Sequence, residues 1–223
     1  MASTTFGKAA DDALPSKALL VIMSWIEIIQ YAESAGRLRK LYDRVKGPGD
    51  NVDNIMLAHG LRPHSMEGHM SLYKSVLHHS GNTIPKWFLE VLGVYVSVLN
   101  TCDYCVEHHL TGLARLLGDE DAAEDILAAL ETEQPIEAFE TKHEEAINYA
   151  RLLTLSPASL TQANVETLRD ASWTDGEILE INQVVAYFNY ANRTVLGLGV
   201  TPDGDIIGLS PGASDDPSDW SHG

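Results

Sequence analysis

Residues 85–118 read PKWFLEVLGVYVSVLNTCDYCVEHHLTGLARLLG, and this stretch decides the fold. Pro85 suits the first turn of a helix, and Gly118 suits the residue that ends one. Residues 94–98 are the only run in the chain with strand character, and they lie inside a longer helical run. The stretch therefore predicts two helices, 85–99 and 101–117, joined by almost no loop and packed antiparallel.

Both cysteines of the chain lie in this stretch, as a Cys-x-x-Cys pair. At about 100° per residue, Cys102, Cys105 and His109 fall within about 60° of one another on one helical face, while His108 lies about 120° from Cys102. If Asn100 or Thr101 caps the helix, both sulfurs lie in its first turn. Free N–H groups and the helix dipole favour a thiolate there, so the pattern predicts reactive thiols with His109 as the proton acceptor.

Glu90 is the expected partner of that histidine. It lies about 14 Å back from the turn between the two helices, and His109 lies about 12 Å forward at ~1.5 Å per residue. The neighbours of Glu90 are apolar, and a lone charge in such a setting costs several kcal/mol unless it is paired. We therefore expect a Glu90–His109 pair, in which the carboxylate tunes the imidazole.

The rest of the chain is also helical in its periodicity. Apolar residues at three-and-four spacing predict one helix from Leu19 to Val45, kinked at Gly36 and ended by residues 47–49. Thr174 and Glu177 form a capping box at the start of a last helix, which Gly197 ends. The remaining helices are expected at 63–79, 119–131, 136–155 and 161–173. The predicted fold class is all-α.

We expect three parts along the chain: a loose arm over residues 1–14, one helical domain over 15–200, and a tail over 201–223. The tail is rich in Gly, Pro, Ser and Asp and has no Lys or Arg, which is typical of a flexible or strapping segment. Trp220 is unusual in such a tail. It either docks onto a neighbouring subunit or is incidental.

Composition excludes several classes of function. The 223 residues carry a formal net charge of −17, which disfavours binding to nucleic acid or to an anionic membrane surface. No apolar window of about 18 residues predicts a transmembrane helix, and residues 18–29 lack the pattern of a signal peptide. Two cysteines are too few for the disulfide framework of a small secreted domain. A cytoplasmic location is expected.

The pattern Glu-x11-Cys-x2-Cys-x3-His resembles the signature of the AhpD-like (carboxymuconolactone decarboxylase-like) superfamily, and residues 100–109 resemble its peroxidase-related branch. The resemblance extends over residues 17–200 and includes the segments 61–64 and 189–193. It implies an AhpD-like helical bundle assembled as a homo-oligomer, a trimer or hexamer, with thiol-dependent peroxidase activity.

By position, the resemblance makes Cys105 the thiol that attacks a hydroperoxide and Cys102 its disulfide partner. His109 and Glu90 become the proton relay. No cofactor or bound metal is implied; an external dithiol or lipoyl-type reductant resets the disulfide. AhpD itself often has a histidine between the cysteines, whereas this chain has Asp103 and Tyr104. The charge of Asp103 would oppose a nearby thiolate.

Four further residues are candidates for the substrate pocket, each with a plainer alternative. Tyr104 donates a hydrogen bond to the peroxide or only packs, and His64 lies near the site or at the surface. Asn189 and Arg193 share a helical face that lines the pocket, forms a subunit contact or is merely solvated.

Two alternative functions remain open. One is a redox sensor or assembly protein that uses the same fold without turnover. The other is a zinc protein, because two thiolates and two imidazoles are a common zinc ligand set, although adjacent histidines diverge on a helix. Decarboxylation is disfavoured, because the decarboxylase branch lacks this cysteine pair.

Overall fold

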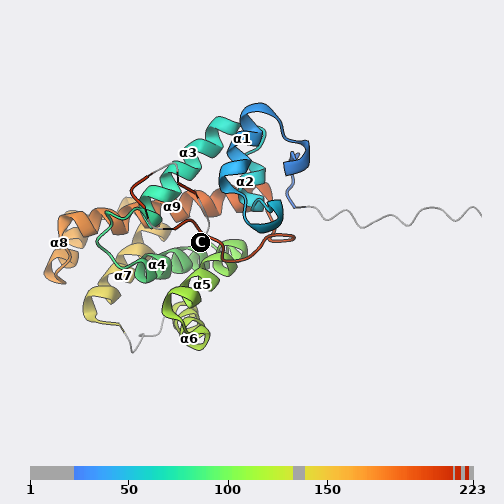
Figure 1. Cartoon of the computed structure of the whole chain (residues 1–223). Coiled ribbons are helices and arrows are strands. Elements are labelled where there is room, and N and C mark those ends of the chain that lie inside the picture. The colour runs from blue at the N-terminus through green and yellow to red at the C-terminus, as the bar shows by residue number, and fades with distance from the viewer. Residues whose placement is uncertain (1–22, 133–138, 213, 217–218, 221–223) are drawn as a thin grey trace, which may run out of the picture.

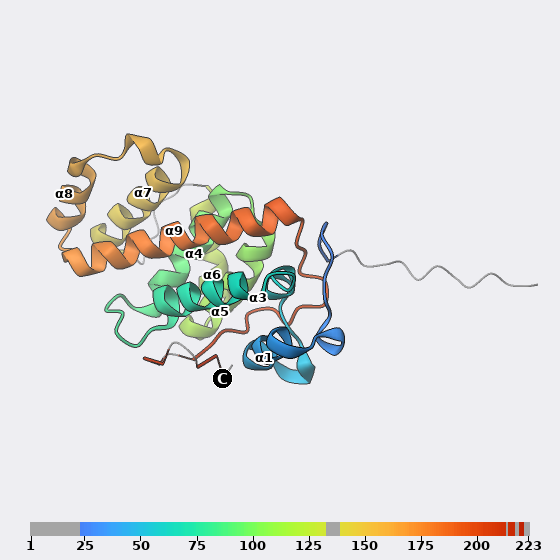
Figure 2. The same cartoon turned by 90° about the horizontal axis from the view of Figure 1, so that it is seen from above.

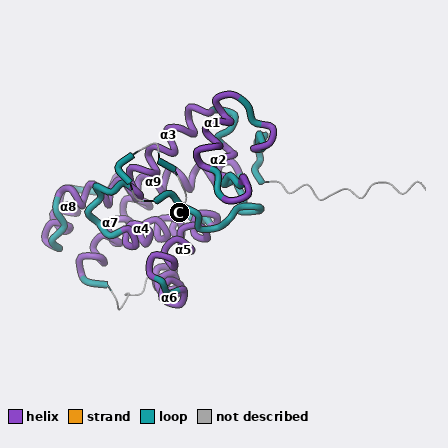
Figure 3. Tube along the Cα trace, in the orientation of Figure 1, coloured by secondary structure: helices purple, strands orange, loops and turns teal. Residues whose placement is uncertain are grey.

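The computed structural model describes residues 23–132, 139–212, 214–216 and 219–220. These residues form helices connected by loops, and their only regular pairing of extended backbone is at isolated bridges such as His79–Ser214 (Figure 3). The all-α prediction is confirmed. The α-helices are α1 (Gly36–Val45), α2 (Asn54–Ala58), α3 (Pro63–Tyr73), α4 (Lys86–Leu99), α5 (Asp103–Leu117), α6 (Glu120–Glu131), α7 (Thr141–Leu155), α8 (Gln162–Asp170) and α9 (Asp175–Leu198).

Helix α4 is the centre of the bundle. It packs against α5, α6, α7 and α9 (Figure 1). Every residue from Phe88 to Ser97 is buried. Gly93 lets α9 approach closely, since a Cβ at this position would lie 2.2 Å from the ring of Phe188. The central helix is apolar on all sides because it is covered on all sides, and Glu90 is the charged residue within that buried run.

The ends of the helices follow the sequence signals closely. Gly118 ends α5 in the left-handed conformation, with φ of 67°, as predicted. The capping box of Thr174 and Glu177 opens α9. This helix runs past Gly197 to Leu198, and Gly199 ends it with φ of 60°, so the predicted end was two residues early.

The predicted helix from Leu19 to Val45 was wrong in its first half. Residues 19–22 lie outside the described residues, and residues 23–35 hold only the 3-10 turn Tyr31–Glu33. Gly36 is the first residue of α1 and not a kink. The backbone of the preceding segment pairs with the end of α9 instead: Trp25 N–H donates to Leu198 O at 2.8 Å, and Met23 O accepts from Thr201 N–H at 3.1 Å.

Other boundaries also differ from the expectation. The region 63–79 is α3 followed by a π-helical turn, Lys74–His78, and the short α2 was not predicted. The start of the expected helix 136–155 lies partly outside the described residues, and α7 begins at Thr141. In both overall views α8 lies at one end of the molecule and α1 at the other, with α9 running between them (Figures 1 and 2). Within the described residues, no helix is long and apolar enough to span a membrane.

The chain beyond α9 turns back over the bundle. Gly208 lies against α5, where a Cβ would come within 2.5 Å of the Thr111 side chain. The fully buried Lys74 donates from Nζ to Gly212 O at 2.5 Å. Trp220 is 3% exposed, and its ring centre lies 5.8 Å from that of Tyr73. Trp220 therefore packs inside its own chain, and the segment that follows α9 helps to close the site described next.

Candidate active site

The two cysteines lie where α4 passes into α5. Cys102 is the residue that precedes α5, and its carbonyl accepts the N–H groups of Cys105 and Val106 at 3.0 Å each. Thr101 takes a left-handed conformation, with φ of 55°, to make the sharp turn. The helix thus starts one or two residues later than predicted. Both thiols are free and buried, with their Sγ atoms 3.2 Å apart.

The two thiols differ in pKa. Their mutual hydrogen bond lowers the pKa of Cys102 and, together with burial, raises the pKa of Cys105 well above its ordinary value. The nearby charge of Asp103 makes a smaller contribution that raises the pKa of Cys102, which is the opposition expected from the sequence. Cys102 is therefore the more acidic thiol of the two, and Cys105 needs a base before it can act as a nucleophile.

A base is present on the same helix. Nδ1 of His109 lies 2.7 Å from Oε2 of Glu90, which is 2% exposed, so the predicted contact between these residues exists. The imidazole and the ring of Phe188 pack in a T-shaped arrangement, with ring centres 4.5 Å apart. Because Nδ1 donates to the carboxylate, Nε2 is the ring nitrogen left to exchange a proton.

Cys105, His109 and Glu90 line one small cavity of about 60 Å³. Cys102 does not line it and is fully buried behind Cys105. Aromatic side chains form much of the remaining wall, and the segment after α9 closes one side. These further lining residues are Val45, Asp53, Ile55, Met56, His69, Tyr73, Tyr104, His108, Gly112, Tyr187, Ala191, Gly208, Leu209, Ser210, Pro211 and Trp220.

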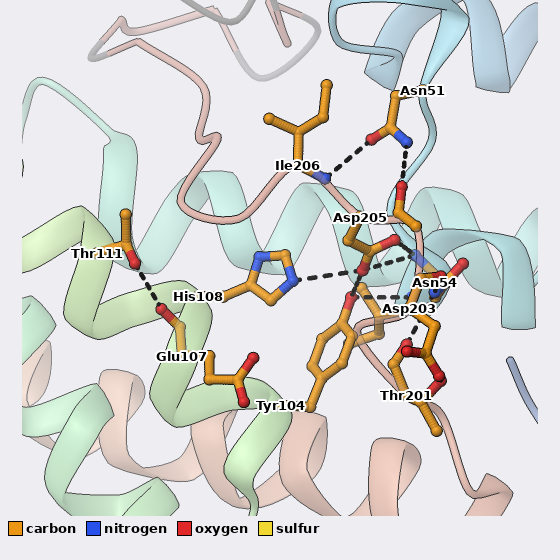
Figure 4. A network of polar contacts seen from close by, with 12 residues as sticks. Asn51, Asn54, Tyr104, Glu107, His108, Thr111, Thr201, Asp203, Asp205 and Ile206 are labelled. Atoms are coloured by element: carbon orange, nitrogen blue, oxygen red, sulfur yellow. Dashed lines mark hydrogen bonds and ion pairs between the residues drawn. The ribbon is translucent and has the colours of Figure 1, made fainter.

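The adjacent histidine, His108, faces a second carboxylate. Its Nε2 lies 3.3 Å from Oδ2 of Asp205, which belongs to the segment after α9 (Figure 4). The same oxygen accepts a hydrogen bond of 2.7 Å from the hydroxyl of Tyr104, and Oδ1 accepts one of 2.9 Å from Asn54 N–H. Asp205 thus ties together α5, the start of α2 and the segment after α9. Each of the two consecutive histidines that line the cavity is thus paired with a carboxylate.

Asp53 is the second acidic residue, after Glu90, that lines the cavity. Burial raises its pKa to about 6; the positive charge of His108 opposes this rise and the negative charge of Asp205 adds to it. A carboxyl group tuned to this range exists in both protonation states near neutral pH.

Behind the cysteines lies a buried amide network. Asn192, which is fully buried, donates to Ser97 Oγ at 3.1 Å and accepts from Asn100 Nδ2 at 2.9 Å. Asn100 also donates to Asn189 Oδ1 at 3.1 Å, and Arg193 donates to the same oxygen at 2.6 Å. A hydrogen bond from Asn192 also lowers the pKa of each thiol, although it is a minor contribution for both.

The structure separates the predicted pocket residues into three groups. Tyr104 lines the cavity and is bonded to Asp205. Asn189 and Arg193 do not line it and belong to the amide network behind the thiols. His64 is exposed at the start of α3 and is not part of the cavity wall.

Sequence reasoning missed Asp53, Asp205, Tyr73 and Asn192. Asn192 stands inside the segment 189–193 that carries the resemblance, so its position gave a signal. Asp53 and Asp205 have none, because they come from loops that only the folded chain brings to α5. Among the described residues, no group of three or more His, Cys, Asp or Glu side chains is arranged to hold a metal ion.

Comparison with known proteins matches the fold at low sequence identity. No family model and no curated protein sequence matches the chain. An uncharacterized peroxidase-related protein from Ralstonia eutropha JMP134, described as an alkylhydroperoxidase AhpD core, superposes with a TM-score of 0.70 and 20% identity over 81% of this chain and 92% of its own. A peroxidase-related protein from Silicibacter sp. TM1040 gives the same four values.

A debrominase is also similar in structure. The debrominase Bmp8 superposes with a TM-score of 0.62 and 17% identity over 81% of this chain and 91% of its own. The helical bundle is therefore shared by a peroxidase-related protein and by a debrominase, so the fold alone does not decide the activity. The chain has an AhpD-like fold.

Proposed function

We propose that the protein is a thiol-dependent peroxidase that reduces an organic hydroperoxide or hydrogen peroxide through a Cys102–Cys105 disulfide cycle. One observation carries this proposal. Cys105 lines a cavity together with the Glu90–His109 pair, while the second thiol lies 3.2 Å behind it and away from that cavity. This arrangement supplies an attacking thiol, a base and a resolving thiol within residues 102–109.

The chemistry follows from the geometry. His109 takes the proton of Cys105, and Glu90 stabilises the resulting imidazolium. The Cys105 thiolate attacks one oxygen of the peroxide, so that an S–O bond forms as the O–O bond breaks, and the products are a sulfenic acid and an alcohol or water. Cys102 then displaces water from the sulfenic acid to form the disulfide. An external dithiol, for which a lipoyl-type compound is our candidate, reduces it by exchange.

The test begins with reduced protein and one equivalent of cumene hydroperoxide, followed by thiol titration and mass spectrometry. We expect loss of both thiols and a Cys102–Cys105 disulfide. Cys102→Ser should complete one turnover and leave a sulfenic acid on Cys105 that dimedone traps. Cys105→Ser should consume no peroxide, and equal activity of the two variants would disprove the assignment of roles.

Reductive dehalogenation of an aromatic compound is a second candidate. The observation in its favour is the aromatic wall formed by Tyr73, Tyr104, Tyr187 and Trp220 beside Cys105. The debrominase Bmp8 has been crystallised, as a variant, with 2,3,4-tribromopyrrole. The same dithiol has the two electrons needed to replace bromine by hydrogen. Release of bromide from tribromopyrrole in step with disulfide formation, without reaction with peroxide, would favour this candidate.

We also propose a cytoplasmic homo-oligomer, a trimer or hexamer. The segment before α1 supports assembly, since Trp25 is 74% exposed and Ile26 is 37% exposed. Light scattering tests the assembly, and a monomer would disprove it.

A non-catalytic redox sensor would form the same disulfide but would not consume peroxide continuously in the presence of a dithiol.

A further inference from the structure

We propose that Asp53 is a second catalytic residue of this cavity: the acid that protonates the departing oxygen when Cys105 breaks the peroxide bond. The inference rests on the proposed peroxidase function and adds a residue to it. Asp53 precedes α2, and so belongs to a wall of the cavity that carries neither thiol and neither member of the Glu90–His109 pair.

The direction of the displacement requires an acid on such a wall. In an attack at oxygen, the leaving oxygen departs in line with the incoming sulfur and on the side opposite to it. His109 follows Cys105 by one turn of the same helix, so it stands on the side of the nucleophile. A proton for the leaving oxygen is better placed on a different segment, and Asp53 meets that condition.

His69 and the three tyrosines of the cavity wall are less suited to this role, and His108 faces the Asp205 carboxylate from α5, the helix that also carries the nucleophile. His69 is buried with its pKa lowered to about 3, so it is neutral near pH 7 and has no labile proton to give as an acid. Burial holds the pKa values of Tyr73, Tyr104 and Tyr187 well above 10, which makes them weak acids.

Asp53 differs from Asp205 in how its carboxyl group is bonded. The Asp205 carboxylate accepts from Tyr104 and from Asn54 N–H and faces His108. Within the described residues, no donor bonds the Asp53 carboxyl group, which leaves it open to a ligand in the cavity. Two neighbouring carboxyl groups in such unequal surroundings are typical of an acid and its charged companion.

The surroundings of Asp53 keep part of it protonated. Burial is the main cause that raises its pKa to about 6, the charge of Asp205 adds to it, and His108 on α5 opposes it. Tyr73 on α3 and Tyr104 on α5 also face it, and both are neutral. By this pKa, about one Asp53 in ten carries a proton at pH 7.

The displacement conserves atoms and electrons. The Cys105 thiolate bonds to the terminal oxygen of the hydroperoxide, and the hydrogen of that oxygen stays with it in the sulfenic acid. The O–O bond breaks, the alkoxide takes the proton of Asp53, and an alcohol leaves. Sulfur is oxidised by two electrons and the peroxide bond is reduced by two. Asp53 returns to its acid form by taking a proton from solvent before the next turnover.

The experiment compares two oxidants that differ in their leaving groups. Cumene hydroperoxide expels an alkoxide, which needs a proton, whereas peracetic acid expels acetate, which does not. The second-order rate constant of Cys105 oxidation is measured for each by stopped flow. We expect Asp53→Asn to slow the reaction with cumene hydroperoxide about 100-fold and that with peracetic acid by less than about 3-fold.

The pH profile provides a second readout. The readout is the rate constant with cumene hydroperoxide divided by that with peracetic acid. This ratio does not depend on the fraction of Cys105 present as thiolate. In the wild-type protein the ratio should fall as pH rises through about 6, because Asp53 loses its proton; in Asp53→Asn it should not change with pH. Asp53→Glu keeps a carboxyl group, so its ratio should lie between those of Asp53→Asn and the wild-type protein.

Asp203→Asn is the matched control, because this exposed aspartate lies outside the cavity, and it should keep the wild-type ratio. Equal slowing with both oxidants in Asp53→Asn would show a structural role and overturn the inference, as would an unchanged ratio. If the wild-type thiols react with neither oxidant, the proposed function itself fails and the role of Asp53 fails with it.

Discussion

Oε2 of Glu90 and Nδ1 of His109 lie 2.7 Å apart across the interface of α4 and α5. This contact selects one tautomer of the imidazole and fixes the direction of its other nitrogen, as a carboxylate does in other histidine-based sites. The buried glutamate and the cavity histidine therefore act as one unit, in which Glu90 positions the base and does not itself reach the thiol.

Replacing that carboxylate tests the unit. Glu90→Gln keeps the shape but removes the charge that stabilises imidazolium, so oxidation of Cys105 by peroxide should slow about 10- to 100-fold. The pH profile of Cys105 alkylation should move upward, because the thiolate loses support. Glu107→Gln, an exposed residue of the same helix, is the control. Wild-type rates and an unmoved profile in Glu90→Gln would contradict the relay.

Asn192 links stability to thiol chemistry. Asn192→Leu removes a donor to Ser97 and an acceptor for Asn100, and the unpaired groups should lower the free energy of unfolding by about 1–3 kcal/mol. The thiols should also become harder to ionise, which alkylation against pH measures. Asn182 lies on α9, as Asn192 does, and donates to the hydroxyl of Tyr149 on α7; Asn182→Leu breaks this bond and should lower stability without changing the alkylation profile. A shifted profile in both variants would refute a specific role for Asn192.

His69 makes stability depend on pH. Burial lowers its pKa from 6.5 to about 3. Between pH 3 and pH 6.5 this histidine is therefore mostly protonated in the unfolded chain and mostly neutral in the folded protein. The free energy of unfolding contributed by this residue is fully present above pH 6.5 and falls by about 1.4 kcal/mol per pH unit below it, until about pH 3.

Urea unfolding at several pH values measures this dependence. His69→Phe should flatten the slope between pH 6.5 and 4, although the neighbouring His59, whose pKa is also lowered by burial, keeps part of it. His64→Gln, at an exposed position, should leave the slope unchanged. If the slope survives in His69→Phe at its full size, the acid sensitivity originates elsewhere.

Gly93 sets the distance between α4 and α9. A methyl group there meets the Phe188 ring at 2.2 Å, so Gly93→Ala should lower the free energy of unfolding by about 1–3 kcal/mol or more. Gly68→Ala is the matched control in α3, where nothing lies within 4 Å, and should raise it by about 0.5–1 kcal/mol. Thermal unfolding of the two variants compares them directly. Similar midpoints would show that the helices move apart at little cost.

The sequence predicts most of the bundle because its signals are local. Gly118 and the Thr174–Glu177 box act within one turn of backbone, and both do in the structure what the pattern indicates. The Glu90–His109 contact is also nearly local, since a tight turn joins the two helices. The face that carries Cys102, Cys105 and His109 follows from helical geometry alone.

The parts that sequence reasoning missed depend on distant segments. Apolar spacing over residues 23–30 suits a helix, but the backbone there pairs with Leu198 and Thr201, and no local pattern indicates a partner so far along the chain. For the same reason, sequence patterns did not indicate that Asp53 lines the cavity or that Asp205 pairs with His108. Helical geometry places His108 away from the face of Cys102, and its partner Asp205 comes from the segment after α9, which that geometry does not include.

The adjacency of His108 and His109 has an evolutionary consequence. Side chains of consecutive residues diverge by about 100° on a helix, and here each meets a carboxylate from a different segment, Asp205 or Glu90. Inserting or deleting a single codon between Cys105 and His108 would rotate both imidazoles away from their partners at once. We therefore expect the length of the segment 102–109 to be constrained even where the lengths of surface loops are not.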